Sequence, residues 1–202
     1  MVVIVNGASG LAGNVRGQMI ARTAVLLAKK GLQGASFSEV LQASGAPRGS
    51  LYHHFPGGKD ELVLAALDAA GAHAMSVLDK LEGRTAAEVA TSFVALWRSV
   101  LASSDFGAGC AVAAVTVAAN APALLEKAAG VFRQWRTRLG ALLAAGGVEP
   151  KRAGALAATL ISACEGAVIL ARAEDAFEPF DLVAAEQIAA IRAAQAGPGR
   201  KR

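Results

Sequence analysis

The stretch of this chain that most restricts its fold is residues 36–62, SFSEVLQASGAPRGSLYHHFPGGKDEL. Ser36 is a candidate N-cap with Glu39 three residues later, and Gly45 can adopt the positive φ that a tight turn requires. Pro47 stands where a second short helix begins, and its missing N–H costs nothing at that position. The order of these residues predicts two short helices joined at a tight turn, with another helix after them.

The second of these helices, about residues 47–54, has an apolar side and a polar side. Leu51 and Phe55 point inward at i,i+4 spacing. The residues left toward solvent or a ligand are Arg48, Gly49, Ser50, Tyr52 and His53. Arginine can fork onto a guanine edge, glycine permits close approach, and the others can donate to bases or phosphates. Lys59 begins the next helix, where its ammonium suits a phosphate. The pattern predicts a helix-turn-helix whose second helix lies in the DNA major groove.

The composition favours an all-α protein with a basic N-terminal part. Of the 202 residues, 54% are hydrophobic and 18% are charged, with alanine and leucine dominant. Residues 1–62 carry six Lys and Arg against three acidic residues, whereas residues 63–199 carry eleven against thirteen. The basic excess therefore lies with the half expected to bind DNA and with the tail of residues 200–202.

A series of residues in the N-terminal part occurs in the order found in a known family. They are Gly31, Ser36, Glu39, Val40, Ser44, Gly45, Gly49-Ser50-Leu51-Tyr52-His53-His54-Phe55 and Lys59-Asp60-Glu61-Leu62. Residues 16–62 thereby resemble the N-terminal domain of TetR/AcrR transcriptional regulators. The resemblance implies that Tyr52, His54 and Lys59 contact phosphates, and that Arg48, Gly49 and Ser50 lie nearest the bases. We add Ser36 to these expected DNA-binding residues.

The rest of the chain is expected to form a larger helical domain. Helices are predicted over about 60–81, 85–101, 111–119, 122–145, 150–173 and 182–194. The start at Gly109-Cys110, followed by a small apolar helix, resembles the C-terminal domain of the lincomycin-resistance-type branch of the family. The predicted domains are a flexible leader (1–14), a three-helix DNA-binding domain (15–60), a ligand-binding and dimerisation domain (61–196) and a basic tail (197–202).

Five residues of the larger domain are candidates for an effector site. Phe93, Trp97, Phe132 and Trp135 are the large side chains available to line an apolar cavity, although the same residues could simply pack the core. Glu165 is a carboxylate inside an apolar helix, and a surface position is the alternative for it.

The last two helices are apolar enough to need a partner surface. By the pattern of the family they would pair with their copies in a second subunit as a four-helix interface. Gly154, Ala158, Ser162 and Gly166 are spaced by four residues and would allow a close approach of helices. The alternative is that these two helices close the core of a monomer.

The first residues, VVIVNGASGLAGN, offer a competing function. Gly7, Gly10 and Gly13 resemble the phosphate-binding turn of an NAD(P)-binding oxidoreductase. That motif also needs a second strand and an acidic residue near position 33, and the sequence has neither. We therefore expect a flexible leader, and a protein that is not an enzyme and has no cofactor.

Two further classes of site are not expected. Cys110 and Cys164 lack metal-ligand spacing, so buried free thiols in a reducing compartment are predicted and no metal site. The apolar stretch of residues 155–173 contains Glu165 and Gly166, so we expect a buried helix and no membrane partner. The sequence thus predicts a cytoplasmic homodimer that binds double-stranded operator DNA, represses transcription, and is released from a palindromic operator by an unidentified small-molecule effector.

Overall fold

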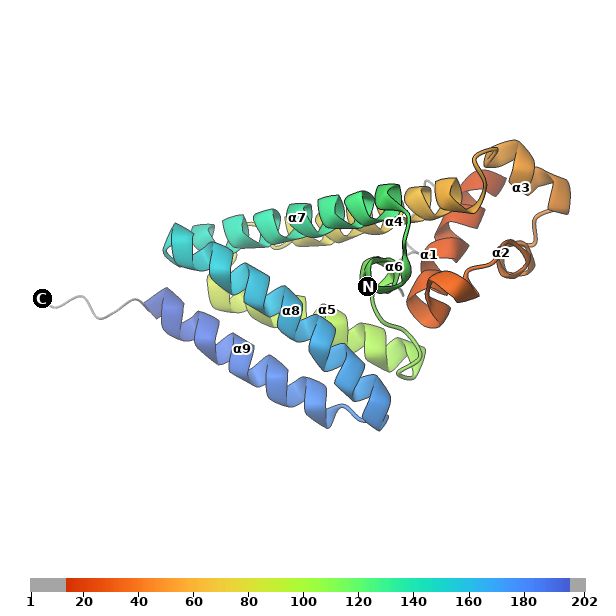
Figure 1. Cartoon of the computed structure of the whole chain (residues 1–202). Helices are drawn as coiled ribbons and strands as arrows, with labels where there is room; N and C mark the ends of the chain where they lie inside the picture. Colours follow the sequence, from red (N-terminus) through yellow and green to blue (C-terminus); the bar gives the residue numbers. More distant parts are fainter. Residues whose placement is uncertain (1–13, 197–202) are drawn as a thin grey trace, which may run out of the picture. The chain divides into compact units, whose positions relative to one another are not determined.

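The computed structural model describes residues 14–196, and every regular element in this range is an α-helix (Figure 1). The helices are α1 (Val15–Gly34), α2 (Phe37–Ser44), α3 (Arg48–His54), α4 (Gly58–Asp79), α5 (Ala86–Ser104), α6 (Ala111–Ala118), α7 (Pro122–Ala145), α8 (Pro150–Glu174) and α9 (Glu178–Ala196). The all-α prediction is confirmed. The predicted tail (197–202) and the predicted leader, apart from Asn14, lie outside the described residues.

The described residues form two compact units. The first unit holds the residues up to Ala74 together with Ala108–Phe132, and the second holds Met75–Gly107 together with the residues from Arg133 onward. Helices α4 and α7 therefore each contribute residues to both units. The predicted boundary between residues 60 and 61 divides the chain by role rather than by contacts, and it stays a prediction.

Helix α1 begins at Val15 and continues past Gly31 to Gly34. The Asn14 side chain caps its start by accepting a hydrogen bond from the Gly17 N–H at 2.6 Å. Gly31 interrupts the helical path with a φ of +72°, a conformation that favours glycine. Met19 and Leu27 are fully buried on the inner side of the helix. Within the first unit, this side packs against α2, α3 and α6.

Both cysteines are buried free thiols, as predicted. Cys110 also caps α6, because its Sγ accepts a hydrogen bond from the Ala113 N–H at 3.4 Å. The preceding residue fixes this helix to α1 through a hydrogen bond of 2.9 Å from the Gly109 N–H to the Ala28 carbonyl. Burial raises the pKa of Cys164 to about 12, so this thiol stays protonated at neutral pH.

Three helices of the second unit, α5, α8 and α9, pack against one another. At the start of α5 a capping box is present: Thr85 Oγ1 accepts from the Glu88 N–H, and Glu88 accepts from the Thr85 N–H at 2.9 Å. At the start of α8, the Glu149 carboxylate accepts from the N–H groups of Lys151 and Arg152 at 3.0 and 2.9 Å. Local side chains therefore fix where both helices begin.

The start of α9 corrects the sequence-based prediction. The helix begins at Glu178 rather than at about Leu182, so the segment between α8 and α9 is shorter than predicted. Pro179 is compatible with the first turn, where N–H groups have no partner inside the helix. Glu178 and Asp181 also lie in this turn, close to the positive end of the helix dipole.

Two of the described helices, α4 and α8, are long and apolar enough to cross a membrane by length and composition. In each, 44% of the most apolar window is buried inside the protein. Core helices of soluble proteins pass the same test, so this property carries little weight by itself.

Candidate DNA-binding site and effector region

Helix α3 has a buried inner side and an exposed outer side, as predicted. Leu51 and Phe55 are 1% and 0% exposed. The outer side holds the exposed residues Arg48, Gly49, Tyr52 and His53, with Ser50 and His54 half-buried. The inner side chains anchor the helix to its neighbours, which leaves the outer side free to meet a ligand.

The turn between α2 and α3 fixes the direction of α3. Gly45 takes a left-handed φ of +68°, and its N–H donates a hydrogen bond to the Leu41 carbonyl at 2.9 Å, which ends α2. Pro47 then takes the N-cap position, so α3 begins at Arg48, one residue later than predicted. The fixed φ of proline leads the chain directly into the new helix.

A hollow of about 280 Å³ lies between α2 and α3. It is lined by Phe37, Ser38, Leu41, Arg48, Leu51 and Tyr52. The Tyr52 ring, 70% exposed, stands edge-on to the Phe37 ring with 5.9 Å between centroids. The predicted site did not include Phe37 and Ser38. A large aromatic directly after the N-cap was the available signal.

Ser36 acts as the N-cap of α2, and its predicted capping box is only half formed. Its Oγ accepts a hydrogen bond from the Glu39 N–H at 3.3 Å. The Glu39 carboxylate pairs with Lys30 Nζ at 2.6 Å. The hydrogen bond described at this N-cap is the one that the Glu39 backbone N–H donates to Ser36. A role for Ser36 in DNA binding stays a prediction.

Lys59 has a structural contact at the start of α4. Its Nζ donates to the Leu32 carbonyl at 2.8 Å, which ties α4 to the end of α1. Nearby, the Glu61 carboxylate accepts from the Gly57 N–H at 2.8 Å, so that N–H is already used. An ammonium has three donors, and the Lys59 contact therefore leaves donors for a phosphate.

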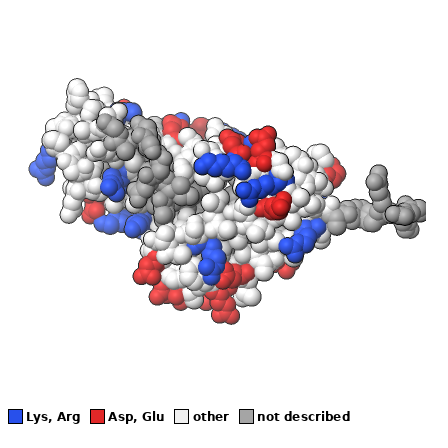
Figure 2. Space-filling view, turned by 180° about the vertical axis from the view of Figure 1, so that it is seen from behind, with Lys and Arg blue, Asp and Glu red and all other residues white. Residues whose placement is uncertain are grey.

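The surface around α3 carries more positive than negative charge. Arg48 forms no ion pair among residues 14–196, whereas the exposed carboxylate of Glu39 is paired with Lys30. The guanidinium of Arg16 lies over the Phe55 ring, 5.0 Å from its centroid. Figure 2 shows basic side chains spread over the end of the surface that α1–α3 form, with few acidic ones in that view. This balance suits a polyanion.

The five predicted effector residues are divided between the two units. Phe93 and Trp97 on α5, Trp135 on α7 and Glu165 on α8 belong to the second unit, and Phe132 belongs to the first. The side chains of Phe93, Trp97 and Trp135 are buried, and those of Phe132 and Glu165 are half-buried. The hollows that the structure describes are lined by other residues, so an effector cavity at these positions stays a prediction.

Trp97 is the member of this group with a distinctive polar feature. Its side chain is 2% exposed, and its indole Nε1–H has no hydrogen-bond acceptor within the described part of the chain. An unsatisfied buried donor costs about 1–3 kcal/mol. The donor is therefore available to a bound molecule that brings an acceptor.

Two short helices joined at a glycine turn, with a polar outer side on the second, define a helix-turn-helix DNA-binding protein. Residues 19–66 match the family described as bacterial regulatory proteins, tetR family, and residues 86–186 match the C-terminal domain of LmrA/YxaF-like transcriptional regulators. The chain belongs to the TetR family of transcriptional regulators, in its LmrA/YxaF-like branch, as the sequence resemblance predicted. Because TetR proteins are regulators rather than enzymes, the oxidoreductase alternative has no support.

The relatives agree along most of the chain. An uncharacterised HTH-type transcriptional regulator of Mycobacterium tuberculosis is 39% identical over 176 residues, covering 83% of this chain and 89% of that protein. The uncharacterised regulator YxaF of Bacillus subtilis is 26% identical over 181 residues, covering 87% and 94%. A crystal structure of a TetR regulator from Chloroflexus aurantiacus superposes with a TM-score of 0.75 at 26% identity, covering 90% and 96%.

Proposed function

We propose that this regulator is a homodimeric repressor that binds a palindromic operator and leaves it when a small molecule binds. The observation that carries the DNA-binding part is α3, whose Arg48 and Tyr52 project from a helix anchored by Leu51 and Phe55. We place the protein in the cytoplasm, where operator DNA lies, and propose no membrane partner. Two copies of α3 would read two half-sites in inverted arrangement.

The residues of α3 divide into base readers and phosphate contacts. Arg48, Gly49 and Ser50 occupy its first turn, where the small side chains allow the helix to approach the base edges. Tyr52 and His54 would donate to phosphates, together with His53 or the free donors of Lys59. An arginine at a guanine edge carries specificity, whereas the phosphate contacts supply affinity that falls with salt.

The test is binding of the full chain to the promoter beside its own gene, followed by gel shift or fluorescence anisotropy. We expect the double variant Arg48→Ala/Tyr52→Ala to lose operator binding, because bidentate base contacts contribute about 1–3 kcal/mol each and both side chains are exposed. Both substitutions leave the inner side of α3 unchanged. Circular dichroism should therefore show the wild-type helix content.

A matched control is Lys80→Ala, which removes an exposed cation outside the helix-turn-helix. This variant should bind the promoter like the wild type. If the double variant also shifts the promoter like the wild type, α3 is not the reading helix and the proposal is wrong.

The dimer would form through α8 and α9. The exposed side of α8 between Arg152 and Arg172 holds small and aliphatic residues, namely Gly154, Ala155, Thr159, Ser162, Gly166, Ile169 and Leu170. Exposed Leu182 and Ala185 continue this character on α9. An exposed face with so little charge is typical of a surface that another protein chain covers.

The effector would bind among the aromatic residues of the second unit. Phe93, Trp97 and Trp135 supply an apolar surface, and the Trp97 indole N–H supplies a donor that needs an acceptor. We therefore expect an apolar effector with a carbonyl or similar acceptor. The proposed contacts of Glu165 and Phe132 with the effector rest on the sequence alone. The effector lowers operator affinity only if it binds more tightly to the conformation that does not fit DNA than to the one that does.

Trp97→Phe tests this site, since phenylalanine keeps an aromatic ring and removes the unsatisfied donor. A thermal-shift screen of the wild type first identifies stabilising compounds. The variant should keep the stability of the wild type and should lose most of the shift that such a compound produces. If the shift is unchanged, the effector does not use the indole N–H.

A further inference from the structure

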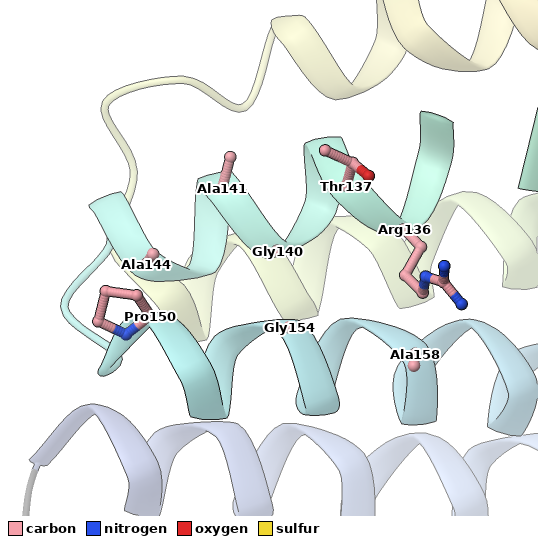
Figure 3. Close-up of a pocket in the computed structure, with 8 residues that line it drawn as sticks. All are labelled: Arg136, Thr137, Gly140, Ala141, Ala144, Pro150, Gly154 and Ala158. Carbon is pink, nitrogen blue, oxygen red and sulfur yellow. The ribbon is translucent and has the colours of Figure 1, made fainter. Parts of the chain in front are cut away.

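Two hollows in the described part of the chain have walls of different chemistry. One of them, of about 550 Å³, lies between α7 and α8, beside the point where an added Cβ on Gly140 would be 3.5 Å from the Gly154 Cα (Figure 3). Most of its wall consists of small side chains, such as those of Ala141, Ala144 and Ala158. Side chains of this size offer few groups that could orient a neighbour.

The hollow between α2 and α3, of about 280 Å³, is instead bordered by two aromatic rings. Phe37 is half-buried at the start of α2, and Tyr52 is 70% exposed on α3. Their ring centroids lie 5.9 Å apart and the ring planes meet at 82°, so the edge of one ring faces the other. Aromatic pairs favour this arrangement, because the edge and the face of a ring carry opposite partial charge.

The ring contact with Phe37 restricts the Tyr52 side chain. In the part of the chain that the structure describes, the Tyr52 hydroxyl takes part in no hydrogen bond, and the next ring along α3, that of His53, faces His54 with 5.1 Å between centroids. A long side chain on a helix has two common χ1 rotamers, and a largely exposed one meets few atoms that select between them. The Phe37 ring therefore supplies the selection that water does not.

Phe37 has a fixed place because the start of α2 is held on both sides. Ser36 caps the helix by accepting from the Glu39 N–H at 3.3 Å, and its Oγ lies 3.1 Å from Ser38 Oγ. Glu39 in turn pairs with Lys30 on α1 at 2.6 Å. The ring at position 37 thus rests on a helix start whose hydrogen bonds and ion pair form without DNA.

We propose that Phe37 is a positioning residue for operator binding, which holds the Tyr52 ring in the orientation that meets a phosphate before the DNA arrives. This inference rests on the proposed function, in which Tyr52 donates to a phosphate. A side chain that is ordered in advance loses less rotamer freedom when it binds, so its contact contributes more affinity. Phe37 itself needs no contact with the duplex.

The first test measures the affinity of the full chain for the promoter beside its own gene by fluorescence anisotropy. We expect Phe37→Leu, which keeps an apolar side chain but removes the ring, to raise Kd about two- to tenfold, as the usual strength of an aromatic pair implies. Phe37→Tyr keeps a ring and should bind nearly as tightly as the wild type. The matched control is Phe106→Leu, because Phe106 is also half-buried and paired with a ring, that of Phe177 at 4.7 Å. This control should bind like the wild type.

A double-mutant cycle separates positioning of Tyr52 from general support of α2. If Phe37 acts through Tyr52, Phe37→Leu should change Kd by less than about twofold once Tyr52 is replaced by alanine. Low salt keeps the weaker binding of the Tyr52→Ala background measurable. An equal loss in both backgrounds would mean that Phe37 supports α2 or touches the DNA itself, and it would overturn the inference.

The ring contact can also be observed in the wild type, since Tyr52 is the single tyrosine of the 202 residues. With isotope-labelled tyrosine, NMR should show nuclear Overhauser effects between the Tyr52 and Phe37 rings, both in the free protein and with the operator bound. Phe37→Leu should shift the Tyr52 ring signals, and Phe106→Leu should not. Ring contacts that are absent from the free wild type, or that disappear when the operator binds, overturn the inference whether or not the variants fold.

The outcomes separate this inference from the proposed function. A Phe37→Leu variant that binds the promoter as tightly as the wild type, while Arg48→Ala/Tyr52→Ala fails to bind, overturns the positioning role and leaves α3 as the reading helix. If Arg48→Ala/Tyr52→Ala binds like the wild type, the proposed function fails and this inference fails with it. A loss in Phe37→Leu that depends on Tyr52, together with the ring contact in free and bound protein, supports the positioning role.

Discussion

Helices α3 and α8 each keep one side exposed, but the two exposed sides have opposite character. On α3 the exposed side carries Arg48, Tyr52 and His53, which donate hydrogen bonds or bear charge. On α8 it carries small and aliphatic residues such as Gly154 and Ile169. Both helices bury their other side among aliphatic residues.

The difference shows that the exposed side, rather than the buried one, carries the information about the partner. A polar and basic side costs little free energy when it faces water, and it forms favourable contacts with phosphates and base edges. An uncharged, aliphatic side gains by leaving water, so it fits another protein surface. Substitutions at inner and at outer positions of the two helices should therefore differ in the size and kind of their effects.

The largest effect is expected on the inner side of α3. Leu51→Ala should lower the free energy of unfolding by about 2–5 kcal/mol, because Leu51 is 1% exposed and its removal leaves a cavity. Tyr52→Ala, one position later and 70% exposed, should change it by less than about 1 kcal/mol. Urea unfolding of both variants gives the comparison. Equal losses would mean that Tyr52 belongs to the core and not to the DNA-binding side.

Two glycines sharpen the comparison between a packed and an open position. An added Cβ on Gly146 would lie too close to the backbone nitrogen of Ala86, whose N–H donates to the Gly146 carbonyl at 3.0 Å. We expect Gly146→Ala to destabilise the protein by about 1–3 kcal/mol. Gly49 is open, so Gly49→Ala should stabilise by up to about 1 kcal/mol through helix propensity.

The same Gly49→Ala variant should weaken operator binding, because the added methyl group holds α3 away from the bases. Thermal unfolding and a promoter titration on one preparation measure both effects. A variant that is more stable and binds DNA as tightly as the wild type would show that Gly49 does not lie against the duplex.

A smaller effect is expected at the turn between α8 and α9. Arg98 pairs with Asp181 at 2.8 Å and lies over the Phe177 ring, 4.1 Å from its centroid. The hydrogen bonds that Arg98 donates to the Asp181 carboxylate raise the pKa of Arg98, but both side chains are about half exposed, so water screens the pair. Asp181→Asn should therefore cost less than about 1 kcal/mol, and 1 M salt should remove most of that difference. Glu186→Gln, also exposed on α9, is the control.

The parts of this fold that sequence patterns predict are those fixed by local chemistry. Gly45 ends α2 at a positive φ, and Pro150 begins α8, where the patterns placed them. Leu51 and Phe55 were assigned to the core from spacing alone, and both are buried. In each case the residues that decide the conformation lie within a few positions of one another.

The features that were missed depend on residues far apart in the chain. The Glu39 carboxylate goes to Lys30 on the neighbouring helix instead of completing its capping box. The Lys59 ammonium reaches the Leu32 carbonyl, a contact that no local pattern contains. The hollow between α7 and α8 likewise arises only when Gly140 and Gly154 meet. Periodicity predicts which side of a helix is apolar, but not which neighbour it meets.

The smallest expected effect compares the two capping boxes directly. At Thr85 the box is complete, and the hydrogen bonds from Thr85 lower the pKa of Glu88 below its ordinary 4.5. A carboxyl whose pKa is lower in the folded state adds stability above its unfolded pKa and loses it as the pH falls through the folded pKa. Glu88→Gln keeps a side-chain acceptor but removes the charge. It should therefore flatten the acid side of the stability curve, between about pH 5 and pH 2.

Glu39→Gln is the matched change at the half-formed box, where the carboxylate meets Lys30 instead of a backbone N–H. Thermal unfolding across this acid range should separate the two variants, with the larger change of slope in Glu88→Gln. An identical slope in Glu88→Gln and the wild type would mean that the charge of Glu88 does not stabilise the start of α5. The hydrogen-bond geometry of the box, which glutamine preserves, would then be sufficient to fix where that helix begins.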